Sequence, residues 1–239
     1  MFYYALVISL IATVVFLVLR VKKGGLPGAF SKTGASLAFV MLGVAAVFDR
    51  LQDPAGIIVN QTFNRWSLFI LVGLVAGLIG DIFLDLKFIV LDKTDAFTFA
   101  GFASFIFCHV MYLVMLWNCM VFPIWVVFLA IAFGAIAALF ILFNERRMGV
   151  KYGKFKAISV VYAGILVFFS TMCLGIMITN KYADATVMLY LGSLLFLISD
   201  FILCGTYFGE NKNTPPYVLA NHITYYLAQI LIASSILKI

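Results

Sequence analysis

Apolar and polar residues alternate along the chain in long blocks rather than in short helical or strand periods. Eight apolar stretches meet or approach the roughly 20 residues that a helix needs to cross the hydrocarbon core of a bilayer. They cover approximately residues 2–20, 34–50, 66–88, 96–118, 120–143, 157–179, 185–207 and 216–237. The second stretch is the shortest. The pattern predicts an all-α, polytopic helix bundle with eight transmembrane helices in a single membrane domain, residues 1–239.

Composition leads to the same class of protein. Of the 239 residues, 65% are hydrophobic and only 11% are charged, whereas a soluble domain is about half apolar and about a quarter charged. A soluble fold has no way to bury this much apolar surface, so the solvent must be lipid. The net charge of +6 does not indicate nucleic acid as a partner, because the basic residues lie in short runs between the apolar stretches.

These basic runs predict the orientation of the chain. Twelve basic residues fall on one side of the predicted bundle and four on the other. The first group comprises Arg20, Lys22, Lys23, Lys32, Lys87, Lys93, Arg146, Arg147, Lys151, Lys154, Lys156 and Lys212, and the second comprises Arg50, Arg65, Lys181 and Lys238. By the positive-inside rule the twelve-residue side is cytoplasmic; attraction of a phosphate head group is the alternative role for these residues. We therefore expect a multi-pass protein of the plasma membrane with both termini outside.

Acidic residues inside the apolar stretches are the first candidates for function. An ionisable side chain at bilayer depth costs roughly 2.5–3.5 kcal/mol on insertion scales, so it is expected to have a role. Asp81 and Asp85 lie toward the end of stretch 66–88, and Asp200 lies within stretch 185–207. These two stretches run in the same direction, so Asp81 and Asp200 should lie at similar depth, in the cytoplasmic half of the membrane.

Each acidic stretch is followed by a helix with a His-x-x-Tyr sequence. Asp81 is followed by His109 and Tyr112, and Asp200 is followed by His222 and Tyr225. An i, i+3 pair shares one face of a helix, so these side chains can approach the aspartates if the helices are neighbours. The similarity predicts a parallel repeat of residues 1–118 and 119–239 about an axis along the membrane normal. Chance similarity is the alternative, because few residues match.

A small-xxx-small pair precedes Asp81 on the same helix. Gly73 and Gly77 are four residues apart, and such pairs usually permit the close approach of a neighbouring helix. We expect them to serve packing in this way; room for a substrate chain is the alternative.

The sequence resembles the YhhN-like lysoplasmalogenase family in four stretches. These are residues 80–84, 102–112, 192–200 and 225–232, and the resemblance as a whole spans roughly residues 66–237. The family often has Lys-Pro at the start of its second helix, whereas here Lys32 is followed by Thr33.

The resemblance implies an enzyme that hydrolyses the vinyl ether bond of lysoplasmalogens to a fatty aldehyde and a glycerophospholipid head. It also implies that Asp81 and Asp200 are the catalytic pair and that no cofactor or metal is needed. The partners would be the lipid substrate and the bilayer. Further residues for substrate binding or orientation are Asp85, His109, Tyr112, Ser199, Tyr225 and Gln229.

The chemistry suits two carboxyl groups. Protonation of the alkenyl carbon distal to the ether oxygen produces an oxocarbenium ion, which water then attacks. A buried carboxyl group favours its protonated form, and a nearby like charge acts in the same direction. One aspartate can therefore serve as general acid while the other, as carboxylate, stabilises the cation and accepts a proton from water. The sequence does not assign the two roles.

Three alternatives remain open at this point. A metal held by His109, His222 and one or two aspartates is the second mechanism. A proton- or cation-coupled transporter that uses the intramembrane aspartates is the second function. The third hypothesis is a structural or lipid-binding membrane protein that catalyses no reaction.

Overall fold

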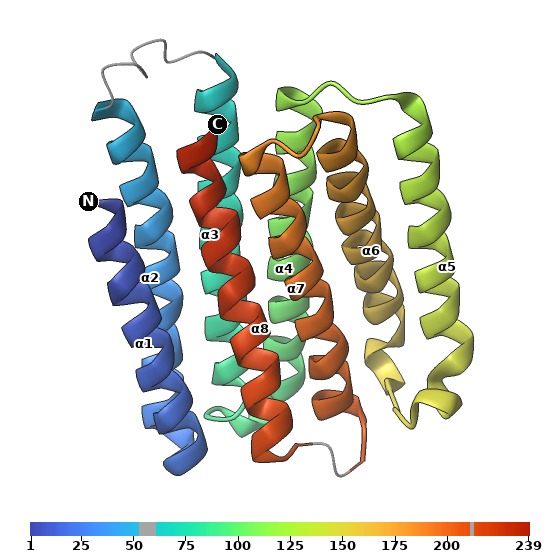
Figure 1. Cartoon of the computed structure of the whole chain (residues 1–239). Helices are drawn as coiled ribbons and strands as arrows, with labels where there is room; N and C mark the ends of the chain where they lie inside the picture. Colours follow the sequence, from blue (N-terminus) through green and yellow to red (C-terminus); the bar gives the residue numbers. More distant parts are fainter. Residues whose placement is uncertain (53–60, 211–212) are drawn as a thin grey trace.

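A computed structural model describes residues 1–52, 61–210 and 213–239 of the chain. Within these residues the chain forms eight long helices, which run up and down in succession (Figure 1). They are α1 (Phe2–Lys22), α2 (Gly25–Gln52), α3 (Gln61–Leu86), α4 (Thr94–Cys119), α5 (Ile124–Met148), α6 (Lys156–Thr179), α7 (Asp184–Phe208) and α8 (Pro215–Ser234). The predicted all-α bundle of eight helices is confirmed.

Helices α1 to α7 are long and apolar enough to cross a membrane, so the protein is an integral, multi-pass membrane protein. Helix α8 is more polar because it carries Asn221, His222 and Gln229, all of which are buried. Its 20 residues still extend about 30 Å, the thickness of the hydrocarbon core. Helix α8 packs against α1, α2, α3 and α7, so its polar residues face protein rather than lipid.

The start of α2 differs from the prediction. The helix begins at Gly25, nine residues before the expected start at 34, and is the longest of the eight rather than the shortest. Ser31 and Thr33 lower the local hydropathy, but their hydroxyl groups donate to backbone carbonyls one turn earlier. Lys32 is 4% exposed and lies within α2, so it is not a charge on the segment that connects α1 and α2. The predicted excess of basic residues on that side survives this correction.

The two ends of the bundle differ in their number of basic residues. Both termini lie at one end, and the connections α1–α2, α3–α4, α5–α6 and α7–α8 lie at the other (Figure 1). We call the second the basic end, because the larger group of basic residues lies there; Lys212 of that group is outside the described residues. The orientation in the cell and the repeat of residues 1–118 and 119–239 stay predictions.

Candidate active site

A polar cavity of about 620 Å³ lies toward the basic end of the bundle. Five of the predicted site residues line it, and so do His222 and three basic side chains. The five are Asp81, Asp85, Ser199, Asp200 and Tyr225, and the basic residues are Arg20, Lys32 and Lys87. Helices far apart in the sequence thus bring both aspartates of the expected pair to one cavity.

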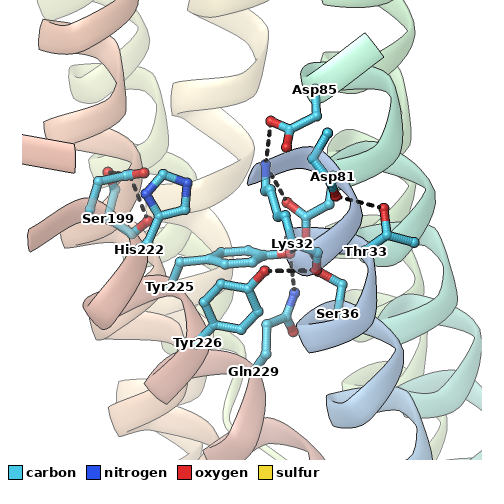
Figure 2. A network of polar contacts seen from close by, with 12 residues as sticks. Lys32, Thr33, Ser36, Asp81, Asp85, Ser199, His222, Tyr225, Tyr226 and Gln229 are labelled. Carbon is cyan, nitrogen blue, oxygen red and sulfur yellow. Dashed lines mark hydrogen bonds and ion pairs between the residues drawn. The ribbon is translucent and has the colours of Figure 1, made fainter. Parts of the chain in front are cut away.

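Asp81 is surrounded by donors from α2 and α8. It is 3% exposed, and Lys32 Nζ lies 3.1 Å from its Oδ1. Ser36 Oγ and Tyr225 Oη donate to Oδ2 at 2.6 and 2.7 Å. In Figure 2 the Lys32 side chain reaches between Asp81 and Asp85, with Tyr225 and Ser36 beside Asp81. Three donors on one buried group satisfy a carboxylate well.

Tyr112 and Gln229 lie behind Tyr225 rather than in the cavity. Tyr112 Oη donates to Gln229 Oε1 at 3.3 Å, and Gln229 Nε2 donates to Tyr225 Oη at 3.2 Å. Tyr225 in turn donates to Asp81. Every donor in this series points toward Asp81, so Tyr112 and Gln229 position Tyr225 instead of contacting a ligand in the cavity.

The glycine pair of α3 makes room for these side chains. A Cβ on Gly73 would lie 2.2 Å from the Tyr112 ring, and a Cβ on Gly77 would lie 2.8 Å from Gln229 Nε2. The predicted close approach is therefore made by side chains of α4 and α8, which fill the space that the glycines leave. The pair thus supports the hydrogen-bonded series that ends at Asp81.

Gly77→Ala is expected to lower the free energy of unfolding by about 1–3 kcal/mol, because the added methyl group overpacks the site against Gln229. The matched control is Gly34→Ala on α2, where a Cβ meets nothing within 4 Å and alanine favours the helix. Thermal unfolding of both variants in detergent measures the difference. Equal melting temperatures for the two would contradict the contact with Gln229.

Asp85 belongs to the same ionic cluster. Its Oδ2 lies 3.3 Å from Arg20 Nη1, and its Oδ1 lies 3.6 Å from Lys32 Nζ. The side chain is as buried as Asp81, at 3% exposed. Lys32 therefore bridges two buried carboxylates. Arg20 pairs with one of them, Asp85, on the side nearer the basic end.

Asp200 has a simpler environment. The hydroxyl group of Tyr162 on α6 donates to its Oδ2. Asp200 also lines a second, almost wholly apolar groove of about 670 Å³ between α4, α5, α6 and α7. The neighbouring Ser199 is tied to α8, since Asn221 Nδ2 donates to its carbonyl and hydroxyl oxygens at 2.7 and 3.1 Å. Asp200 thus stands where the polar cavity and the apolar groove meet.

The two histidines do not contact the aspartates directly. His109 is fully buried among aromatic rings, 5.9 Å from the ring of Tyr162 and 4.5 Å from that of Phe196. Its Nδ1 bonds the carbonyl of Phe105, and the Nδ1 of His222 bonds that of Val218. In the described parts of the chain, no three His, Cys, Asp or Glu side chains come together as a metal site would require.

This arrangement is found in a chain that matches the YhhN family over residues 29–236, most of its length. The protein belongs to the YhhN family. That family includes lysoplasmalogenases. The matched region contains most residues of the polar cavity, including Lys32, Asp81 and Asp200. The chain matches neither a curated protein nor a solved structure.

For this member of the YhhN family, sequence reasoning did not place several residues of the site. Lys32 and Ser36 lie in the polar segment that shifted the expected start of α2 to 34. The family's Lys-Pro sequence had pointed to Lys32, although Thr33 follows it here. Tyr162 lies in an ordinary apolar stretch, where nothing distinguishes it from a packing residue. Arg20 and Lys87 were counted as topology residues, although both line the cavity.

Proposed function

We propose that the protein is a lysoplasmalogenase, a hydrolase of the vinyl ether bond of single-chain alkenyl phospholipids. The observation that carries the proposal is the position of Asp200 on the wall of both the polar cavity and the apolar groove, with Asp81 on the same cavity. A lysoplasmalogen has its reactive bond at the same kind of boundary, between one hydrocarbon chain and a glycerophosphate head.

The apolar groove suits the alkenyl chain. Phe133, Ile136 and Phe140 of α5 contribute to its wall, and Leu166 and Phe201 complete it from α6 and α7. The polar cavity suits the head, since charged side chains from α1, α2 and α3 line it. We further propose, from the distribution of basic residues, that the basic end faces the cytoplasm of a plasma-membrane protein and that both termini lie outside.

The two aspartates divide the acid and base roles according to their surroundings. Asp81 has three donors that favour a carboxylate, whereas Asp200 has one donor among the described residues and borders an apolar groove. Asp200 gives its proton to the distal alkenyl carbon, and the electron pair of the ether oxygen forms the oxocarbenium ion. Water attacks this ion and loses a proton to Asp81. The hemiacetal hydroxyl then returns a proton to Asp200 while protonated Asp81 protonates the leaving glycerol oxygen, which releases the aldehyde.

The direct test uses the purified protein in detergent with a lysoplasmalogen. Release of fatty aldehyde is followed with time, and a diacyl phospholipid and a saturated 1-O-alkyl lysophospholipid serve as controls. Aldehyde from the alkenyl lipid alone is the expected result. Folded protein that releases none would remove the proposal and leave the proton- or cation-coupled transporter, which needs no such reaction.

Ala163→Phe is expected to change chain-length preference, because Ala163 lines the apolar groove. The larger ring removes room for about two methylene groups, each of which contributes roughly 0.8 kcal/mol when buried. The ratio of kcat/KM for a long-chain over a short-chain lysoplasmalogen should fall about tenfold. Ala157→Phe, at an exposed position on the same helix, is the control. An unchanged ratio would place the chain outside this groove.

A further inference from the structure

Lys87 is a buried lysine that makes no salt bridge to a carboxylate in the described chain. It follows directly after α3 and is 8% exposed. Its contacts are with aromatic faces: Nζ lies 3.1 Å from the ring centroid of Tyr207 and 4.9 Å from that of Phe88. Burial, reinforced by the positive charge of Lys32, lowers the pKa of Lys87 to about 7. A lysine that serves only as a topology residue needs no such burial.

Arg20 lies beside Lys87 at the mouth of the cavity. Its guanidinium carbon stands 5.4 Å from the centroid of the same Phe88 ring. One of its nitrogens, Nη1, reaches Asp85, while a guanidinium carries five N–H donors. Asp85 offsets part of the repulsion between the two cations, because it pairs with Arg20 and its charge also acts on Lys87, but the remaining donors of both side chains are left for another anion. Arginine and lysine together are a common pair for phosphate recognition.

The distance from the reacting residue fits a glycerophosphate. Tyr207, on which Lys87 stacks, is seven residues beyond Asp200 on α7, which is a rise of about 10 Å toward the basic end. Asp200, Lys87 and Arg20 all line the same polar cavity. A lipid with its ether bond at Asp200 therefore has room for the glycerol before its phosphate reaches the two cations.

We propose that Lys87 and Arg20 bind the phosphate of the single-chain phospholipid substrate and so make the site selective for phospholipids over neutral ether lipids. The assignment rests on the proposed function, since it places the ether bond at Asp200. Lys32 takes no part in this subsite, because it is held between Asp81 and Asp85.

The experiment compares two alkenyl ethers of the same chain length, an alkenylglycerophosphoethanolamine and an alkenylglycerol without phosphate. Wild-type protein should show a kcat/KM at least about tenfold higher for the phosphate-bearing lipid. Lys87→Met should raise the KM for that lipid about tenfold to hundredfold, with kcat within about twofold, and leave both constants for alkenylglycerol unchanged. Lys93→Met, at an exposed lysine of the same connection, is the matched control.

Several outcomes would overturn the assignment. Equal losses on both lipids would make Lys87 a packing residue. Equal kcat/KM of the wild-type protein for both would remove phosphate selectivity, and this comparison stands even if Lys87→Met does not fold. Competition by inorganic phosphate as strong as that by glycerophosphoethanolamine would indicate a site for the free anion.

A failure of the proposed function itself is distinguishable. If the wild-type protein releases aldehyde from neither lipid, binding of a saturated 1-O-alkyl lysophospholipid and of the matching 1-O-alkylglycerol is measured instead. Tighter binding of the phospholipid that Lys87→Met weakens about tenfold supports the phosphate subsite without any reaction. Equal affinity for the two lipids in the wild-type protein overturns it.

Discussion

Asp200→Asn is expected to release fatty aldehyde from lysoplasmalogen about a hundredfold to ten-thousandfold more slowly than the wild-type protein, the range that a general acid supplies. The amide keeps an oxygen that accepts from Tyr162, which donates to the carboxyl group in the wild-type protein. The variant therefore loses the transferable proton and little of the packing. Initial rates at saturating substrate measure the effect on kcat.

Two further measurements separate chemistry from folding in this variant. Its thermal unfolding in detergent should match that of the wild-type protein, because Asp200 has no ion pair in the described chain to lose. Asp92→Asn, at an exposed aspartate between α3 and α4, should retain full activity. Wild-type kcat in folded Asp200→Asn would assign the acid to another group and remove the division of roles proposed for Asp81 and Asp200.

Lys32→Met should cost the fold about 3–5 kcal/mol, because it leaves buried carboxylates without their shared cation. Lys32 Nζ stands 3.1 Å from Asp81 and 3.6 Å from Asp85. Asp85 keeps Arg20 as a partner, so most of the loss should fall on Asp81. The free energy of unfolding in detergent, measured with denaturant or heat, tests this.

A double variant identifies the source of that loss. Lys32→Met/Asp81→Asn removes both charges and should recover part of the stability, with a coupling energy of about 2 kcal/mol between the two positions. Lys23→Met, at an exposed lysine beyond the end of α1, is the control and should change stability little. Additive losses in the double variant would argue against a stabilising ion pair between Lys32 and Asp81.

The apolar blocks of the sequence predicted the helices well because membrane spans need long apolar runs, and α3 to α7 lie close to their expected ranges. The start of α2 was missed for the converse reason. Lys32 makes that segment polar, yet its charge is neutralised by Asp81 on another helix. Hydropathy measures the solvent preference of a segment by itself and contains no information on such a partner.

The sequence predicted the two acidic residues of the candidate site but not the difference between their surroundings. The cost of a carboxyl group at bilayer depth pointed to Asp81 and Asp200 without any contact being known. The two sequence surroundings looked equivalent, but Asp81 takes a lysine, a serine and a tyrosine as partners, whereas Asp200 takes Tyr162. Those partners come from other helices, so only the packing of the bundle reveals them.

The place of Asp200 between the cavity and the groove also bears on how a reaction there would end. Cleavage at this boundary yields one product that prefers hydrocarbon and one that prefers water. The aldehyde can leave sideways into the bilayer from the apolar groove, while the glycerophosphate diffuses out at the basic end. Departure by separate routes keeps the products apart and discourages the reverse condensation.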